Sequence, residues 1–506
     1  MLFEGLDHWW HTPYTPYSAK IIRHLYTSLT ALISINALDA SSSTNISINS
    51  ISSSFPTPRF FTQKIDHFND TSGVFRQQYQ LETGFFKPGG PILLFQGEES
   101  TEMIRIESTI LYSWAQELGG IATSIEHRYF GESLPFGNDS WTRDNIQYLT
   151  LDNVMSDSVA FVQSIKANVT GAENSPVIVS SGSYGGFLTA MFRLNHPETF
   201  FGGVAAAGPV AMISEDEANN KDRFNWYNWV SGVYSDRSAE AAAKIKKAFL
   251  VLEQRFKNND NLAGLQQELG LCSAPTNSTL DFLLLAGFLG NTFSFGAEFN
   301  YAEAQPGRSS VARPLDLIVN AVVAQSDPIQ VLNVTQWVWY GPYGFDCLDF
   351  VDSTSKNGIY SSVPLMQFIP FSYILCTYLP IDGSSISNDT IFLPSDSYKE
   401  GSISFCNETW GLQPPTGEVL KAKYHFTPEE INNSERILFS VGQYDPATSI
   451  APAIPPSGNR NASRTLYVSD MAHREDLFAP SNFDSLAVVQ ARKIELETIK
   501  GWIGLY

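Results

Sequence analysis

The sequence has few cysteines, few positive charges and no long apolar run, and each shortage argues against a class of protein. Its 506 residues include 32 lysine and arginine residues against 52 aspartate and glutamate residues, for a formal net charge of −20. A nucleic-acid partner would need a basic surface to displace counterions from phosphates, so none is expected. No apolar run reaches the ~18 residues of a membrane-spanning helix, so no stable membrane insertion is expected. Residues 281–290 are apolar but short, and they predict a buried helix.

Cysteines and glycosylation signals favour an oxidising compartment. The four cysteines are Cys272, Cys347, Cys376 and Cys406. None has the close spacing of a zinc or redox motif, and their pairing stays open if all are oxidised. Asn-x-Ser/Thr sequons exceed the number that composition predicts, and they are Asn45, Asn69, Asn138, Asn168, Asn277, Asn333, Asn388, Asn407, Asn432 and Asn461. We expect glycosylation there and a secreted, vacuolar or lysosomal protein.

The first residues, 1–58, are assigned to a leader. Residues 1–17 contain acids and two tryptophans, unlike a signal peptide. Lys20 and Arg23 then precede a moderately apolar stretch, which is a weak signal-peptide pattern. A start set too early and a disordered tail with a short helix both stay open. The Ser- and Asn-rich residues 41–54 predict an unfolded segment.

Beyond the leader, strand and helix patterns alternate. Buried strands are expected within residues 89–100, 119–137, 177–179, 202–210, 436–442 and 464–470, and helices over residues 151–169, 187–195 and 483–502. This alternation predicts an α/β fold with a mostly parallel sheet.

The middle of the chain has a different character. Residues 211–425 contain helical patterns, all four cysteines and few strand signals. Adjacent strands of a sheet do not need so long a connection, so we expect an inserted helical cap over the sheet edge. The α/β-hydrolase domain would then comprise residues 59–210 and 426–506.

One serine stands at a corner between a predicted strand and a predicted helix. In the stretch VIVSSGSYGGFLTAMF, Ser183 follows a β-branched run and precedes an amphipathic segment. This arrangement is typical of a nucleophile elbow, in which a strained turn exposes a serine over the sheet. An isolated S-x-S-x-G is a weak signal, so the interpretation needs a base and an acid.

Two later loops supply these partners in the order that the fold requires. Asp445 comes three residues after the strand at 436–442, and His473 follows the strand at 464–470. His473 would act as general base, and Asp445 would fix its tautomer. Other histidines, such as His67 and His127, are more often structural.

Backbone N–H groups near Ser183 are candidates for an oxyanion hole. The N–H of Tyr184 and a second N–H from the turn at Gly97 and Glu98 would stabilise the tetrahedral intermediate. The side chains of Glu98 and Glu99 could hold the free amine of a substrate, although a role as ordinary loop carboxylates is the more common one.

Several motifs carry a family resemblance over about residues 59–503, namely QKIDHFN, GGPILLFQGEES, EHRYFGESLPFG, GSYGGFLTAMFRLNHP, GQYDP, AHRED and ARKIELETIKGWI. The chain resembles the prolyl-specific serine peptidases that include lysosomal Pro-Xaa carboxypeptidase, dipeptidyl peptidase II and fungal acid prolyl endoproteases. The resemblance implies an α/β-hydrolase fold with a helical cap, activity at acid pH and no cofactor. It also implies Ser183, Asp445 and His473 as the triad.

The resemblance also implies finer features. It pairs Cys272 with Cys347 and Cys376 with Cys406. It implies proline on the acyl side of the scissile bond, in an aromatic slot that Phe187 would face. A rigid, apolar proline ring loses little entropy on entering such a slot.

Two positions depart from the family pattern. Ser181 replaces the usual glycine two residues before the nucleophile, and a small serine should fit there with slight strain. Ala447 replaces an aromatic residue, which should leave the triad intact and make the slot roomier.

Several functions stay open at this stage. We expect a serine peptidase of the dipeptidyl-peptidase or Pro-Xaa carboxypeptidase type, acting on proline-containing peptides. A prolyl endopeptidase and a carboxylesterase are the alternatives, and a non-catalytic binding protein would have no reason to keep three triad positions. A homodimer is also left open.

Overall fold

The computed structural model describes residues 55–214, 225–305, 308–352, 355–358, 365–379, 386–395 and 398–504. Most of the predicted leader, with the sequon at Asn45, lies outside these ranges.

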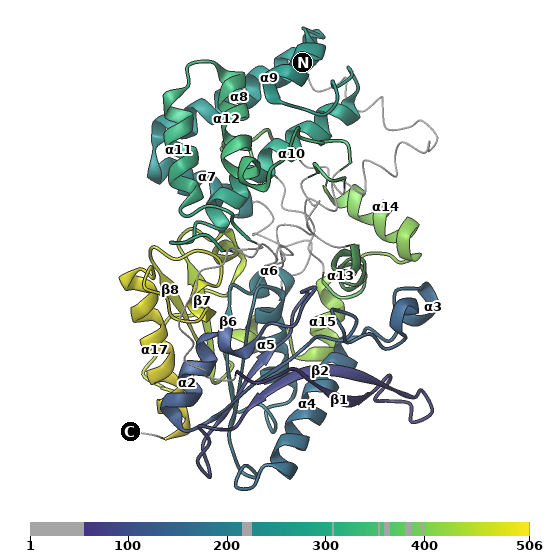
Figure 1. Cartoon of the computed structure of the whole chain (residues 1–506), viewed down its shortest axis with the longest axis vertical. Helices are drawn as coiled ribbons and strands as arrows, with labels where there is room; N and C mark the ends of the chain where they lie inside the picture. Colours follow the sequence, from purple (N-terminus) through teal and green to yellow (C-terminus); the bar gives the residue numbers. More distant parts are fainter. Residues whose placement is uncertain are drawn as a thin grey trace.

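Eight strands within the described residues form one sheet in the order β1-β2-β4-β3-β5-β6-β7-β8. The strands are β1 (Arg59–Lys64), β2 (Val74–Glu82), β3 (Ile92–Gln96), β4 (Ile121–Ile125), β5 (Val177–Gly182), β6 (Gly202–Ala206), β7 (Ile437–Gly442) and β8 (Arg464–Val468). β2 is antiparallel to β1 and β4, and all other neighbours are parallel. The predicted α/β fold with a mostly parallel sheet is confirmed (Figure 1).

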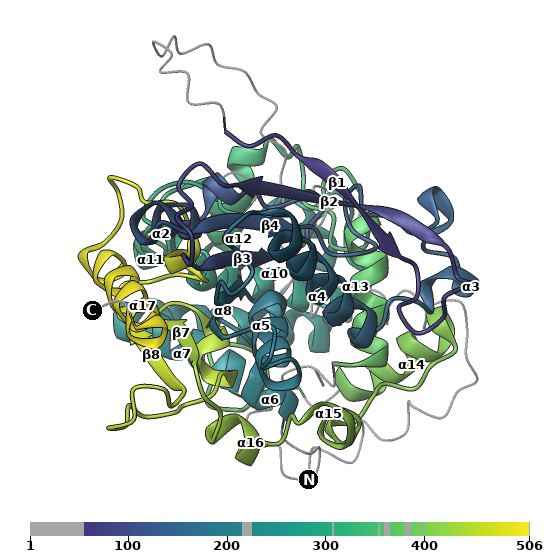
Figure 2. The same ribbon diagram turned by 90° about the horizontal axis from the view of Figure 1, so that it is seen from below.

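Helices cover both faces of the sheet, which explains why its central strands are apolar throughout. On one face, Leu93 and Phe95 of β3 belong to a core with α2 (Ile110–Leu118) and α17 (Leu486–Ile503). On the other, Ile92 and Leu94 belong to a core with α4 (Leu151–Asn168) and α5 (Tyr184–Asn195). Every residue of β3 to β7 is therefore buried among these helices, whose positions around the sheet are seen in Figure 2.

Between β6 and β7 in the sequence comes a group of helices, most of which lie beyond the sheet in space, whereas the first and the last of them pack on α5 (Figure 1). These helices are α6 (Val210–Ser214), α7 (Asn225–Arg237), α8 (Ala239–Asn258), α9 (Leu265–Leu269), α10 (Thr279–Glu298), α11 (Pro314–Ala324), α12 (Pro328–Tyr340), α13 (Leu365–Thr377), α14 (Tyr398–Trp410) and α15 (Gly417–Tyr424). We propose that they form the cap. Short elements elsewhere are α3 (Arg143–Ile146), α16 (Pro428–Asn432), η1 (Ile106–Ser108), η2 (Gly137–Asp139), η3 (Leu262–Gly264), η4 (Gly341–Tyr343), η5 (Pro446–Ile450) and η6 (Glu475–Leu477).

Helix α10 is the central apolar helix of the cap. It extends well beyond the short segment expected at residues 281–290, and by length and composition it could cross a membrane, with a mean hydropathy of 1.3. However, 67% of that apolar window is buried inside the protein, where α10 packs on α7, α11 and α12. These contacts are those of a core helix.

Two disulfides lie among the cap helices. Cys272 pairs with Cys347, linking the chain before α10 to the chain after α12, and their Cα atoms are 4.9 Å apart. Cys376 pairs with Cys406, linking α13 to α14.

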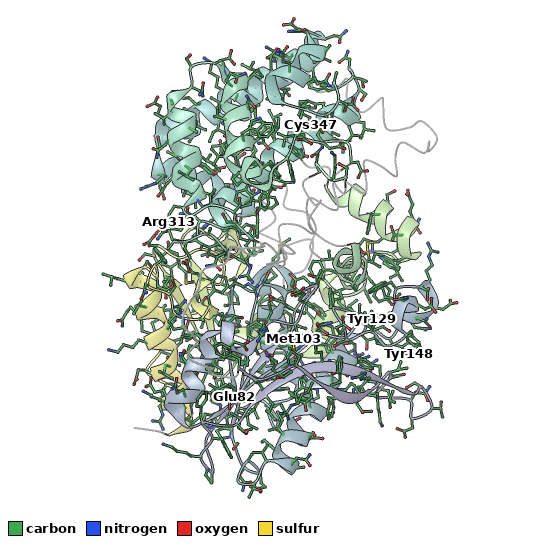
Figure 3. The ribbon with its side chains drawn as sticks, viewed as in Figure 1. Glu82, Met103, Tyr129, Tyr148, Arg313 and Cys347 are labelled. Atoms are coloured by element: carbon green, nitrogen blue, oxygen red, sulfur yellow. A yellow bond between two sulfur atoms is a disulfide. The ribbon has the colours of Figure 1, made fainter. Side chains whose placement is uncertain are left out.

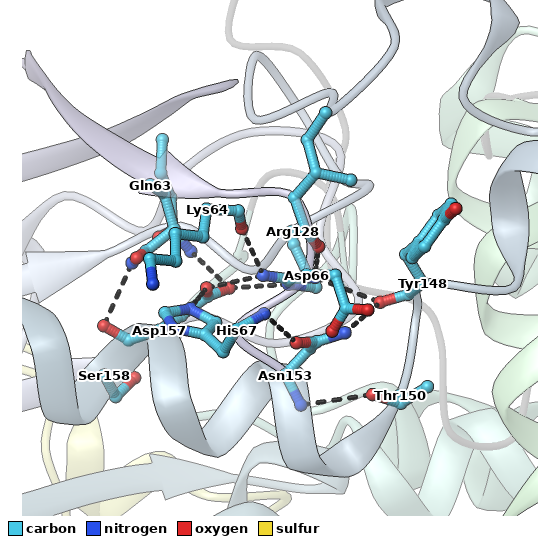
Figure 4. A network of polar contacts seen from close by, with 12 residues as sticks. Gln63, Lys64, Asp66, His67, Arg128, Tyr148, Thr150, Asn153, Asp157 and Ser158 are labelled. Carbon is cyan, nitrogen blue, oxygen red and sulfur yellow. Dashed lines mark hydrogen bonds and ion pairs between the residues drawn. The ribbon is translucent and has the colours of Figure 1, made fainter. Parts of the chain in front are cut away.

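A buried ion pair joins the β1–β2 hairpin to the rest of the sheet (Figure 4). Arg128, after β4, donates from Nε to Asp157 Oδ2 at 2.7 Å and from Nη2 to Asp157 Oδ1 at 2.6 Å. Its Nη1 also donates to the carbonyls of Ile65 and Tyr148, at 2.8 and 3.0 Å. A single guanidinium thus joins the β1–β2 hairpin, the loop after β4 and helix α4.

His67 belongs to the same network. Its Nε2 lies 2.8 Å from Asp157 Oδ1, and its backbone N–H donates to Asn153 Oδ1 at 2.9 Å. The motifs QKIDHFN and EHRYFGES, which supply His67 and Arg128, therefore meet on α4 as a structural joint.

We predict that Asp157→Asn lowers the free energy of unfolding by ~3–5 kcal/mol, because it leaves the buried Arg128 guanidinium without its counter-charge. Urea unfolding followed by circular dichroism measures the change. Asp70→Asn is the matched control, since Asp70 pairs with Lys64 on the surface and its loss should leave stability nearly unchanged. Equal stability of the two variants would contradict the structural role of Arg128–Asp157.

Candidate active site

The turn from β5 into α5 has the strained backbone of a nucleophile elbow. Ser183 has φ 57° and ψ −128°, a conformation that side-chain-bearing residues rarely adopt. Its N–H donates to the carbonyl of Ala206 on β6 at 2.9 Å, and its own carbonyl accepts from the N–H of Gly186 at 2.9 Å. The turn brings Ser183 to the carboxyl edge of the sheet, as the sequence predicts.

Three glycines allow this turn to pack closely. A Cβ on Gly185 would overlap Ser181 Oγ, and one on Gly182 would overlap the side chain of Arg474. A Cβ on Gly186 would lie 2.5 Å from the carbonyl oxygen of Ala206. The elbow is therefore held by the sheet, by α5 and by the loop that carries Arg474.

Asp445 and His473, the predicted acid and base, form a hydrogen-bonded pair at the same edge of the sheet. Asp445 comes three residues after β7, and His473 follows β8 in the neighbouring loop. His473 Nδ1 lies 2.8 Å from Asp445 Oδ2, and the other oxygen of Asp445 accepts from the N–H of Ala447 at 2.9 Å. With Nδ1–H donating to the carboxylate, Nε2 is left as the basic nitrogen.

Residues of the cap also hold His473, and sequence reasoning missed them. The N–H of His473 donates to the carbonyl of Glu298 at 2.9 Å, and the hydroxyl of Tyr301 donates to the carbonyl of His473 at 3.1 Å. The ring of Phe299 meets the imidazole edge to face, with centroids 6.1 Å apart. The end of α10 and the residues after it thus hold the loop of His473 in place. The local sequence of this segment carries no signal of the contact.

Arg313 strengthens the same junction. It lies where the cap meets the C-terminal part of the chain (Figure 3), and its Nη1 donates to Asp470 Oδ1 at 2.8 Å. Its backbone N–H donates to the carbonyl of Tyr301 at 2.8 Å.

The carboxyl group of Glu298 faces the acid–base pair. Potential ligand atoms of Glu298, Asp445 and His473 lie within 4.8 Å of one another. The imidazole Nδ1 that faces both carboxyl groups already donates its proton to Asp445.

Gly97 does not supply an oxyanion donor, contrary to the sequence-based expectation. Its N–H donates to the carbonyl of Ile125 at 2.8 Å, so the sheet already uses that proton. A Cβ at this position would lie 2.5 Å from the N–H nitrogen of His127, so Gly97 is needed for close packing between β3 and β4. The N–H groups of Tyr184 and Glu98 are the remaining candidates.

The two acidic side chains of this turn are unsuited to binding a substrate amine. Glu98 forms a buried ion pair with Arg474, which neutralises its charge. Glu99 is fully buried, and burial, with the neighbouring charge of Glu98, raises its pKa well above the usual range. Their placement favours the alternative interpretation of ordinary structural carboxyl groups.

Phe187 lies in the interior instead of lining a substrate slot. It is fully buried, with its ring centroid 5.1 Å from that of Phe426 and 6.1 Å from that of Tyr184. This side chain lies one turn past Ser183 on α5 and packs in the hydrophobic core. Ala447 is buried as well, so its effect on the substrate pocket stays a prediction.

His127 has a structural role. Its Nδ1 lies 2.7 Å from the carbonyl of Arg128, and its Nε2 lies 3.2 Å from the hydroxyl of Tyr184. Burial lowers the pKa of His127 to about 4, which keeps the ring neutral.

A cavity of about 620 Å³ lies beside the catalytic loop. Its lining includes Arg308, Glu303 and Arg474, with Phe478 and Leu477 as apolar neighbours. Ser183, Asp445 and His473 are not part of that lining, so this cavity is not the acyl pocket.

Most predicted glycosylation sites are accessible. Exposed sequon asparagines are Asn69, Asn138, Asn168, Asn277, Asn388, Asn407 and Asn432. Asn333 and Asn461 are half-buried.

Comparisons with known proteins identify the family and several relatives of this chain. The family model described as serine carboxypeptidase S28 matches residues 63–495. Human lysosomal Pro-X carboxypeptidase is 26% identical over 461 residues, covering 88% of each chain. Prolyl carboxy peptidase like protein 5 of Caenorhabditis elegans is 25% identical, covering 87% of this chain and 88% of that one. Serine protease vicPb of Bipolaris victoriae (strain FI3) is 24% identical, covering 88% of each.

We predict that Ser181→Ala raises the free energy of unfolding by about 1 kcal/mol, because the buried Ser181 hydroxyl has no hydrogen-bond partner among the described residues. Ser158→Ala is the control of opposite sign, since that hydroxyl donates to Gln96 Oε1 at 2.5 Å. Chemical denaturation measures both. If Ser181→Ala destabilises the protein as much as Ser158→Ala does, the Ser181 hydroxyl must be satisfied.

Proposed function

Because the chain belongs to the serine carboxypeptidase S28 family, we propose that it cleaves peptides after proline with Ser183, Asp445 and His473 as its triad. Family membership makes the chain a serine peptidase. The observation that carries the proposed triad is the 2.8 Å contact between His473 Nδ1 and Asp445 Oδ2, in loops at the same sheet edge as the strained Ser183.

The proposed reaction follows from the positions of these groups. Ser183 Oγ attacks the carbonyl carbon while Nε2 of His473 takes its proton, and Asp445 stabilises the resulting imidazolium. The N–H groups of Tyr184 and Glu98 would stabilise the oxyanion. The imidazolium then protonates the leaving amine, and water releases the acyl group by the reverse proton transfers.

Arg474 supports this arrangement from the residue next to the base. Its ion pair with Glu98 joins the histidine loop to the turn after β3. Both side chains are almost completely buried, so the pair is shielded from solvent screening. The pair would hold the Glu98 backbone N–H in place for the oxyanion.

Carboxy-terminal cleavage is the favoured subtype. An aminopeptidase-type site would need an ionised carboxylate for the substrate amine, whereas Glu98 is paired and Glu99 is buried with a raised pKa. The name of the human relative, lysosomal Pro-X carboxypeptidase, supports the same choice. A prolyl endopeptidase is the second candidate of the same family.

The secretory pathway is the proposed location. Two disulfides require an oxidising compartment during folding, and seven of the predicted sequons have exposed asparagines. The lysosomal relative supports this location.

We predict that Ser183→Ala and His473→Ala each lower kcat by ~10⁴- to 10⁶-fold while the fold is retained, because members of a triad act as one unit. Hydrolysis of a proline-containing peptide, together with circular dichroism, measures both properties. Ser457→Ala, in an exposed loop, is the matched control and should keep full activity. Turnover above a few per cent of wild type in a folded triad variant would refute the assignment.

A peptide series that differs only at the acyl-side residue tests specificity. Proline should be cleaved fastest and alanine more slowly, because alanine buries less apolar area, and arginine, leucine and phenylalanine should be poor substrates. Masses of the products from peptides blocked at either end identify the cleavage type. Equal rates for leucine and proline would exclude prolyl specificity even with the triad established.

A further inference from the structure

A carboxyl group from the end of α10 faces the proposed catalytic pair. Glu298, at the end of α10, is 1% exposed, and its Oε1 lies 3.8 Å from His473 Nδ1. This separation is too long for a hydrogen bond. Neither oxygen of Glu298 has a hydrogen-bond partner among the residues that the structure describes.

The surroundings of Glu298 favour its uncharged form. The titratable groups that face it are Asp445 and His473 from the loops after β7 and β8, and Tyr301 from its own segment. From α7, Tyr234 donates to the carbonyl of Phe293, about one turn earlier on α10. Asp445 brings a second negative charge, and the hydroxyl of Tyr301 is already donated to the carbonyl of His473. A buried anion here would lack compensating donors, so ionisation is costly.

The direction of the pKa shift agrees with this geometry. Burial, and then the charge of Asp445, raise the pKa of Glu298 well above its usual range. Burial also raises the pKa of Tyr301, which keeps that hydroxyl protonated.

We propose that Glu298 is a positioning residue for the catalytic histidine, an inference that rests on the proposed triad. As an uncharged acid within 4.8 Å of the Asp445 carboxylate, it places an O–H dipole beside that carboxylate without a hydrogen bond among the described residues, and it leaves a single negative charge facing the imidazole. The proton stays on Glu298 during the reaction, and the bonds that form and break are those of the Ser183 pathway.

The proposal fixes the sign of the pH dependence. At acid pH, Glu298 is neutral, so Asp445 is the single anion beside the imidazole. As pH rises through the pKa of Glu298, the O–H donor is lost and a second anion faces Nδ1. The imidazolium then becomes a weaker acid toward the leaving amine, and activity falls.

The test compares kcat and KM of wild type, Glu298→Gln and Glu298→Leu from acid to alkaline pH on one proline peptide. Glutamine keeps a donor that does not titrate, so its acid limb should superpose on that of wild type while its alkaline limb moves up by at least about one pH unit. Leucine keeps the size and removes the donor, so kcat should fall about 10- to 100-fold with little change in KM. Glu240→Gln, on the exposed cap helix α8, is the control and should leave the profile unchanged.

Two outcomes would overturn the proposal. If the Glu298→Gln and wild-type profiles superpose at both limbs, the carboxyl does not titrate with activity. If the acid limb of Glu298→Gln moves down by a pH unit or more, the carboxyl is charged in the active enzyme. The Ser183→Ala variant separates this result from failure of the triad. If Ser183→Ala is inactive and the Glu298→Gln profile is unaltered, only the role of Glu298 is refuted. If Ser183→Ala is active, the proposed function itself is refuted.

A second measurement covers the case in which the Glu298 variants do not fold. The Nδ1 proton of His473, held by Asp445, should give a far-downfield NMR resonance in the wild-type enzyme. Its shift should change once as the imidazole titrates and again at higher pH as Glu298 ionises. A single titration step would overturn the proposal.

Discussion

The left-handed backbone of Ser183 is the constraint on which the candidate site depends. Such a conformation costs of order 1–3 kcal/mol for a residue with a side chain, and it persists only where the surroundings leave no alternative. Here Gly185 and Gly186 let α5 approach β5 and β6, and Gly182 lets the histidine loop rest against the end of β5. The same close packing that sustains the strained turn therefore brings the loop of His473 against the end of β5, the strand that precedes Ser183.

Local patterns were sufficient to predict strands β3 to β8, the turn at Ser183 and the loops of Asp445 and His473, because each depends on a few neighbouring residues and on the edge at which parallel strands end. The edge strand β1 and its neighbour β2 were missed, since their central strand signals are interrupted by polar residues, several of which are glutamines. The extent of α10 was underestimated because its second half mixes small and polar residues with phenylalanines.

Features that depend on distant contacts could not be predicted. The sheet partner of the Gly97 N–H is Ile125, and the direction of Phe187 is set by packing on Phe426. Likewise, the contacts of Glu298 and Tyr301 with His473 join the cap to the far end of the chain. These contacts tie the proposed cap to the loop of the proposed base, which the expectation of a cover over the sheet edge did not include.

The interruption of the sheet between β6 and β7 also orders the assembly of the site during synthesis. Gly203 must pair with Ile437, so the sheet cannot close until the ribosome has made every helix of the cap. Domains generally fold as units as the chain emerges, and distant pairings of this kind form slowly. Ser183 is made early, whereas His473 is among the last residues to appear. Until then the nascent chain carries Ser183 without the histidine proposed as its base, so the proposed triad cannot act before the chain beyond β8 has been made.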